Sequence, residues 1–285
     1  WFRRRRGAAI GIAAIGTSLG GVIMPPLVAF LFDAVGWRSA NLVLAAMSVA
    51  IIVPLTWLIV RNTPEDKGIA PEPEAPRRNG QSLSDTFPEW TTAMILRQTA
   101  FWVPILSFVP TITAFTSIQL NLAPYALDRG LGLAKASILM SLLSAGMIGG
   151  KLFFGAMVDR WDHRVLYWIA AASMALGISI ILWAPSLIGL IIAVATLGVA
   201  AGGFLPIQGA IFASHFGPMA FGRVSGLAGP FLTISALGPA ITGMMRDKSG
   251  SYDDAFLLWL VLIVPSAMFM AWLPPPGGTA EKEVA

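Results

Sequence analysis

The sequence contains no cysteine and little charge: 12% of its 285 residues are charged, and 56% are hydrophobic. The absence of cysteine excludes a disulfide framework. A soluble domain carries about 25% charged residues, so this chain has too little polar surface to cover a water-soluble globule. Its mean hydropathy of +0.73 agrees with that conclusion. The low content of charged residues and the high hydropathy predict a membrane protein.

Catalytic and metal-binding patterns are also missing. The hydrophobic segments hold no carboxylate and no Ser/His, Asp/Asp or HExxH set, and the chain shows no metal-ligand spacing, nucleophile elbow, phosphate loop or haem motif. An intramembrane enzyme is therefore the weakest interpretation, and we expect no cofactor or metal. The formal net charge of +4 does not indicate a nucleic-acid partner, because excess Lys and Arg fix the orientation of membrane proteins.

What the chain does contain is hydrophobic runs of about 20 residues, the length that crosses a hydrocarbon core of roughly 30 Å. These runs lack the polar stripe of a soluble amphipathic helix. The sequence therefore predicts an all-α polytopic membrane protein with eight transmembrane helices in the lipid bilayer. The expected segments are 8–32, 39–60, 101–123, 136–158, 165–184, 187–213, 224–245 and 255–274.

One long polar stretch, 61–98, separates the second and third segments, and its proline and charge are typical of a flexible linker. Placing Trp1 on the cytoplasmic side puts 13 of the 19 Lys and Arg residues inside, five outside and Lys151 within the membrane. The reverse topology would invert this ratio, against the positive-inside rule. We therefore expect both ends of the chain to be cytoplasmic, in a bacterial inner membrane.

Three motifs together resemble the major facilitator superfamily, in particular its monocarboxylate porters and oxalate–formate antiporters. The opening WFRRRRGAAIGIAAIGTSLGG and the GWR at 36–38 are similar to that branch's YF-x-x-RR-x-x-A-x-G start and outer turn. The loop GAMVDRWDHR at 155–164 is similar to the family's G-x-x-x-D-R-x-G-x-R loop, although Asp162 replaces the middle glycine. The linker 61–98 sits where the family has its inter-domain loop.

The resemblance implies that the eight segments are helices five to twelve of a two-bundle fold, whose first four helices are missing from this sequence. It implies secondary transport by rocking of the two bundles. The implied parts are the last two helices of the N-terminal bundle at 1–60, the cytoplasmic linker at 61–98, a six-helix C-terminal bundle at 99–276 and a cytoplasmic tail at 277–285.

The resemblance also implies a gating role for the cytoplasmic loop that starts at Gly155. In the family this loop braces one group of helices against its neighbour, and that role falls here on Asp159, Arg160 and Arg164. The alternative is a cluster of orienting charges at a segment end.

Glycines recur at intervals of four or five in the first segment, and they include Gly11, Gly16 and Gly20. Such spacing gives a smooth helix face that a partner helix can approach closely. This face could serve static packing, sliding during transport, or both.

Lys151 is the one charged residue inside a segment. It lies eight residues before Asp159, about 12 Å from the helix end at 1.5 Å per residue. A lysine near a membrane-helix centre costs about 2.5–3.5 kcal/mol and usually faces a cavity or a partner. In the monocarboxylate porters this position holds an arginine that contacts the substrate carboxylate, so the resemblance makes Lys151 the candidate anion-binding charge. The alternative is a snorkelling or internally paired structural lysine.

Other polar side chains could complete a substrate site, although such groups often only join helices. The candidates are Gln119, Asn121, Gln208 and Ser235. The sequence thus predicts secondary active transport of a small organic anion, a monocarboxylate by resemblance, with a coupling proton or counter-anion as a further partner. The alternatives are a porter of a neutral or amphipathic solute, with Lys151 paired to an acid on the missing helices, or a non-transporting membrane sensor or scaffold.

Overall fold

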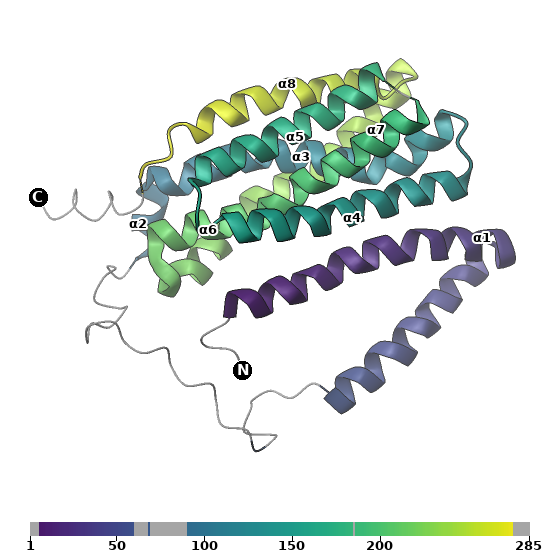
Figure 1. Ribbon diagram of the computed structural model, residues 1–285, viewed down its shortest axis with the longest axis horizontal. Helices are drawn as coiled ribbons and strands as arrows, with labels where there is room; N and C mark the ends of the chain where they lie inside the picture. The colour runs from purple at the N-terminus through teal and green to yellow at the C-terminus, as the bar shows by residue number, and fades with distance from the viewer. Residues whose placement is uncertain (1–5, 60–67, 69–89, 185, 276–285) are drawn as a thin grey trace, which may run out of the picture.

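The computed structural model describes residues 6–59, 68, 90–184 and 186–275, except the side chains of 6–14, 59 and 218. In this part α3 to α8 form a helical bundle, and α1 lies beside it (Figure 1). The elements are α1 (Arg6–Ile59), α2 (Thr92–Arg97), α3 (Thr99–Asp128), α4 (Leu133–Met157), α5 (His163–Trp183), α6 (Leu187–Thr233), the 3₁₀ turn η4 (Ile234–Leu237), α7 (Gly238–Ser249) and α8 (Asp253–Met270).

Two of these helices exceed one membrane crossing, and each turns at a glycine. Gly36 in α1 has φ 73° and ψ 161°, and Gly217 in α6 has φ 79° and ψ 163°. Positive φ is strained for a residue with a side chain, so glycine permits both turns. Seven helical stretches are long and apolar enough to cross a membrane. Because one of them, Ile15–Leu58, turns back at Gly36 (Figure 1), they supply the eight predicted segments.

The seventh crossing is interrupted where a proline removes a backbone donor. It runs from Met219 to Ser249 and contains the turn η4. Pro239 has no N–H for the carbonyl of Ser235, four residues earlier. That carbonyl accepts instead from Gly238 N–H and from Thr116 Oγ1 on α3, at 3.2 Å. The bundle thus replaces the lost helical bond, as the membrane interior requires.

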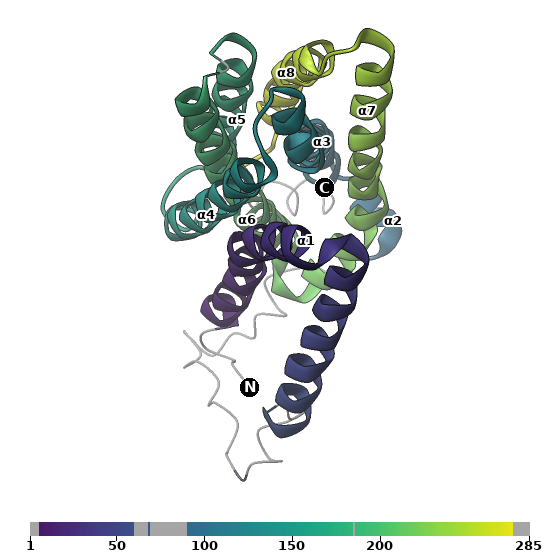
Figure 2. The same ribbon diagram turned by 90° about the vertical axis from the view of Figure 1, so that its right-hand side faces the viewer.

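The central helix of the bundle is α3. It contacts α4 to α8, and Figure 2 shows it with α7 on one side, α4 and α5 on the other, and α8 above. A buried polar knot ties α3 to α5 and α8. In it, Tyr167 Oη donates to the Ser107 carbonyl at 2.6 Å and lies 2.7 Å from Thr111 Oγ1 and 3.1 Å from Ser266 Oγ.

Glycines allow α4 and α6 to touch backbone to backbone. A Cβ added at Gly146 would lie 2.5 Å from the Ala195 carbonyl oxygen, and one at Gly150 would overlap the Val199 carbonyl. On the other helix, Gly198 faces the Leu143 carbonyl, and a Cβ added at Gly202 would lie 2.7 Å from Lys151 N. The four glycines form two Gly-x-x-x-Gly pairs, the spacing that brings membrane helices closest.

The half of α1 before Gly36 packs on α4. Ser141 Oγ donates to the Val22 carbonyl at 2.7 Å, and a Cβ added at Gly21 would lie 2.9 Å from Ser144 Cβ. The predicted packing glycines behave differently: a Cβ at Gly16 or Gly20 would have no atom within 4 Å in the described part. The surroundings of Gly11 lie outside the described residues.

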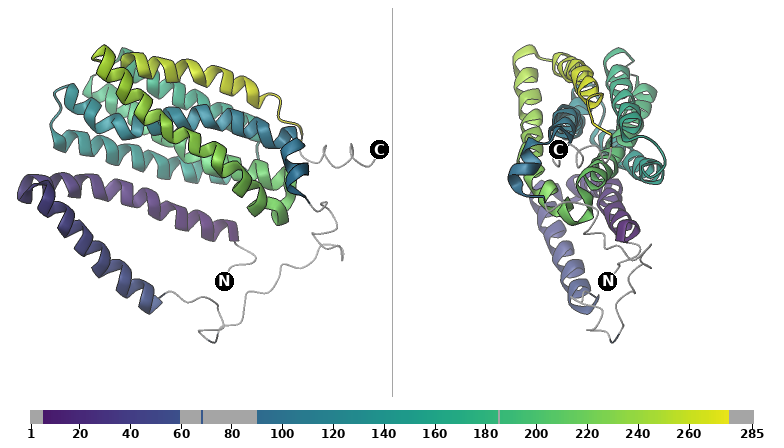
Figure 3. Two further views of the ribbon diagram at one scale, coloured as in Figure 1. Left: turned by 180° about the vertical axis from the view of Figure 1, so that it is seen from behind. Right: turned by 90° about the vertical axis from the view of Figure 1, so that its left-hand side faces the viewer.

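The half of α1 after Gly36 diverges from the bundle (Figure 3). Most of its large apolar side chains are exposed, including Trp57 at 78%. This apolar surface is suited to lipid or to further helices, which are equally apolar neighbours.

The expected linker 61–98 ends in packed residues. Trp90 and Ile95 are buried, and Trp90 contacts Phe216 edge to face with ring centroids 5.0 Å apart. Thr91 caps α2, accepting from Met94 N at 3.3 Å. Residues 90–97 are therefore part of the bundle, while 61–67 and 69–89 lie outside the described residues.

The glycine crossing yields a test of the fold. In Gly150→Ala the new methyl group must displace the Val199 backbone, and such overpacking costs about 1–3 kcal/mol. We expect a lower melting temperature for the detergent-purified protein. The neighbouring Gly149→Ala is the matched control, because a Cβ there has no atom within 4 Å in the described part. Equal melting temperatures for the two variants would contradict the assigned α4–α6 contact.

Candidate functional site

The side chain of Lys151 crosses from α4 to the first half of α1. Its Nζ donates to Ser18 Oγ at 2.8 Å and to Thr17 Oγ1 at 3.2 Å. Lys151 is half-buried, and Ser18 is only 3% exposed. Lys151 lies six residues before the end of α4 at Met157, which places its Cα about 9 Å from that end. An ammonium group is therefore held within a membrane helix pair.

The backbone on the opposite side of Lys151 is fixed by α6. Gly150 and Gly202 bring the two helices together at this level, so the lysine backbone cannot shift toward α6. The glycines that lie near Lys151 on α4 divide into two groups. The space beside Gly146 and Gly150 is occupied by α6. A Cβ added at Gly149 or Gly155 would have no atom within 4 Å in the described part.

Asn121 and Ser235, two of the other predicted substrate residues, lie at a different contact between helices. Asn121 Nδ2 donates to the Ser117 carbonyl at 2.8 Å and to the Pro239 carbonyl at 3.3 Å, which joins α3 to α7. Ser235 Oγ donates to the Leu232 carbonyl at 2.7 Å. The hydrogen bonds of Lys151 to Thr17 and Ser18 run to α1, so the structure does not join Asn121 or Ser235 to it.

The two glutamines have fewer contacts. Gln208 on α6 is buried, and its Nε2 has no hydrogen-bond partner in the described part of the chain. Gln119 is half-buried on α3, and its side chain makes no hydrogen bond within the described residues. Neither glutamine contacts Lys151 through a described hydrogen bond.

The charged loop after α4 is organised by Asp162. Its Oδ1 accepts from Arg164 N at 2.8 Å and caps α5. The aspartate that replaces the expected glycine thus satisfies a helix N-terminus, a role that carboxylates fill well. Asp159 and Arg160 are exposed, and within the described residues neither forms an ion pair.

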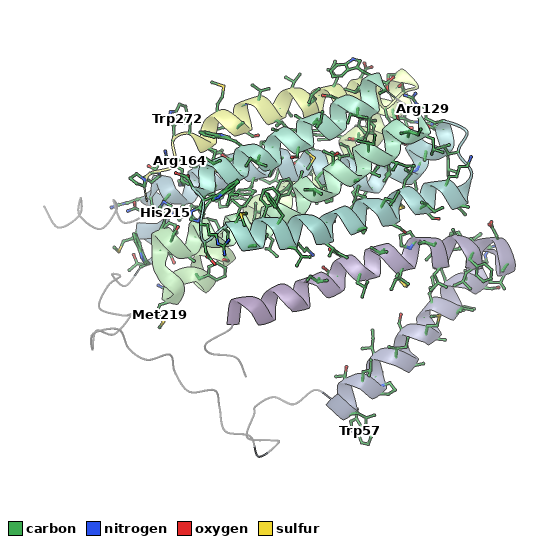
Figure 4. All side chains as sticks on the ribbon, viewed as in Figure 1. Trp57, Arg129, Arg164, His215, Met219 and Trp272 are labelled. Carbon is green, nitrogen blue, oxygen red and sulfur yellow. The ribbon has the colours of Figure 1, made fainter. Side chains whose placement is uncertain are left out.

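Arg164 and His215 hold the segment that follows α8 (Figure 4). Arg164 donates to the Leu273 carbonyl, and His215 Nε2 lies 2.9 Å from the Pro274 carbonyl oxygen. His215 is buried, and its Nδ1 lies 2.8 Å from the Ile211 carbonyl oxygen. The sequence gives one signal for this role: His215 precedes Gly217-Pro218 and so belongs to the last turn before the helix breaks.

Ion pairs join the helices at the opposite end of the bundle, where Figure 4 shows Arg129. Arg246 pairs with Asp128 at 2.9 Å, and Arg129 pairs with Asp253 at 3.3 Å. These contacts link the ends of α3 and α7 and the start of α8. Because the side chains are more than a third exposed, each pair contributes little to stability.

Comparison with known proteins places the fold in a family. The model of the Major Facilitator Superfamily matches residues 1–236 and, in an overlapping match, 130–285. The chain belongs to this superfamily. With its apolar helices, it is therefore a multi-pass integral membrane protein of the superfamily.

Similar proteins include human Monocarboxylate transporter 11, which is 26% identical over 291 residues, covering 96% of this chain and 58% of that protein. MFS transporter asaE of Aspergillus flavus is 27% identical over 280 residues, covering 95% of this chain and 58% of that protein. The chain thus spans less than two thirds of the length of these superfamily relatives. Both are eukaryotic, so they do not support the expected bacterial membrane.

A solved structure shares the fold. It is a bacterial homologue of the human lysosomal transporter Spinster in an inward-facing and occupied conformation. Its TM-score to this chain is 0.64 at 17% identity, covering 95% of this chain and 70% of that one. The match extends over nearly all of this superfamily member.

The contacts of His215 yield a second test. The chain has no cysteine, so a Leu273→Cys variant carries a single thiol at a buried position. Adding His215→Ala removes one of the two side chains that hold residues 273–274, and we expect several-fold faster labelling by a maleimide. His163→Ala is the control, because His163 makes no hydrogen bond to this segment in the described structure. Equal labelling rates with and without His215 would refute the assigned contact.

Proposed function

We propose that the intact protein is a secondary transporter of a small organic anion, and that its substrate is a monocarboxylate bound through Lys151. The observation that carries this proposal is an ammonium group held between two membrane helices, α4 and α1. Superfamily membership and the similarity to proteins named monocarboxylate transporters support it.

The chemistry of the lysine favours an anionic substrate. An ammonium inside a membrane segment costs about 2.5–3.5 kcal/mol on insertion scales, and residues of this kind mark substrate or ion pathways. The hydroxyl groups of Ser18 and Thr17, which accept from it, supply dipoles and no formal charge. A carboxylate would add the opposite charge that hydroxyl groups lack, so that both donor and acceptor of the hydrogen bond are ionised.

The position of Lys151 also suits alternating access. We assign α1 to the N-terminal bundle and the helices from Thr99 onward to the C-terminal bundle, so Lys151 reaches across the boundary between the two bundles. Rocking of one bundle against the other changes the distance between α1 and α4. We place the end that carries Asp159, Arg160 and Arg164 on the cytoplasmic side, following the positive-inside rule.

Uptake of a labelled monocarboxylate tests this proposal. In proteoliposomes that contain the intact protein, we expect Lys151→Ala to lower lactate or pyruvate uptake by at least about tenfold, because a hydrogen bond to a charged group is lost. Lys151→Arg should retain part of the uptake, since it keeps the charge.

Lys135→Ala is the matched control, because Lys135 lies in the first turn of the same helix and is exposed. It should leave uptake unchanged. Wild-type protein that takes up no monocarboxylate, or a Lys151→Ala variant with unchanged uptake, would overturn the proposed function.

A further inference from the structure

Two neighbouring hydroxyl groups on α1 converge on one ammonium group of α4. Consecutive residues of a helix point about 100° apart, yet Ser18 Oγ and Thr17 Oγ1 both lie within 3.2 Å of Lys151 Nζ. A lysine ammonium can only donate, so both hydroxyl oxygens accept from it. The Ser18 hydroxyl therefore keeps its own hydrogen for a different acceptor.

The direction of Ser18 is unusual within this chain. Ser48, Thr111, Ser179 and Thr196 each donate to the carbonyl four residues earlier, the common habit of helical hydroxyls. Within the described part, the one hydrogen bond of Ser18 Oγ is the bond to Lys151. A buried hydroxyl is thus directed at a charge instead of at its own helix.

We propose that Ser18 and Thr17 form the second half of the carboxylate site, a role that rests on the proposed function of Lys151. One carboxylate oxygen accepts from the Lys151 ammonium, and the other accepts from the Ser18 and Thr17 hydroxyls. The hydroxyls only rotate to do this, because the same oxygen atoms that accept from lysine can donate to an anion.

Carboxylate chemistry fits this arrangement. A carboxylate offers two oxygens with about four lone-pair sites, so it can accept from the ammonium and the two hydroxyls at once. A lysine provides a single point charge and lacks the two-pronged fork of an arginine. The hydroxyl pair supplies the directional hydrogen bonds that a lysine alone does not. The site therefore selects a planar anion over a neutral solute.

The site then depends on both helices. Lys151 belongs to α4, whereas Ser18 and Thr17 belong to α1, so a bound carboxylate bonds to both. A ligand held this way favours the arrangement of α1 and α4 in which all three groups meet, as any ligand favours the state it binds best.

The test compares KM values for lactate uptake by the intact protein in proteoliposomes. We expect Ser18→Ala to raise KM about tenfold, the effect of losing one hydrogen bond to a charged group. Thr17→Val, which keeps the side-chain volume, should raise KM less, and the double variant more than either. Thr17→Ser should behave as wild type, because it keeps the hydroxyl.

Ser141→Ala is the matched control for helix packing. Ser141 Oγ also joins α4 to α1, through the Val22 carbonyl at 2.7 Å, but it does not contact Lys151. Its KM should stay at the wild-type value. A rise equal to that of Ser18→Ala would show that loss of helix packing explains the effect, and would overturn the hydroxyl site.

The variants of the lysine and of the hydroxyls test two different claims, the proposed function and the hydroxyl site. If Lys151→Ala loses uptake while Ser18→Ala and the double variant keep the wild-type KM, the hydroxyl site is wrong and the proposed function stands. If Lys151→Ala keeps full uptake, both are wrong. Melting temperatures of all variants in detergent, within a few degrees of wild type, confirm that a changed KM does not come from unfolding.

Discussion

The backbone contact between α4 and α6 fixes the geometry on which the candidate site depends. Gly146 and Gly150 on one helix meet Gly198 and Gly202 on the other, with no side chain between them. Without water to satisfy polar groups, membrane helices gain specificity from packing of this kind. Since Gly202 lies against the backbone nitrogen of Lys151, the contact sets both the depth of the lysine and its orientation. The side chain extends toward α1, where it donates to Ser18 and Thr17.

Features that follow from local chemistry could be predicted from the sequence. Runs of apolar residues gave the eight crossings, and GWR at 36–38 marked the turn at Gly36. The gap between the segments 187–213 and 224–245 also predicted a break, and Gly217 lies in it. The 3₁₀ turn before Pro239 was harder, because neighbouring helices decide whether a proline breaks a membrane helix. Asp162 shows the same limit. It departs from the family's loop pattern, and its capping of α5 was not predicted.

The candidate site could be predicted only in part, because a sequence shows which residues are charged but not which side chains contact one another. Lys151 stood out because one amine in an apolar segment demands a partner. Ser18 and Thr17 did not stand out, because small polar residues in a glycine-rich helix are typical of packing faces. The glycines chosen for that face, Gly16 and Gly20, meet nothing within the described part, and Gly21 makes the close contact. A shift of one residue moves a contact by 100° around a helix, which periodicity alone cannot resolve.

A site shared by two helices also explains why its parts need not be rigid. Lys151 is anchored at its backbone by α6, but its long side chain can follow α1 over a short distance. The hydroxyls of α1 sit on a helix half that contacts the bundle chiefly through α4. In the proposed site, a movement of α1 relative to α4 would separate the ammonium from the hydroxyls, and a bound carboxylate would lose part of its coordination. The same motion that would open a pathway would therefore weaken the bound anion. Under this proposal, one lysine and two hydroxyls that join a pair of membrane helices would couple the two events.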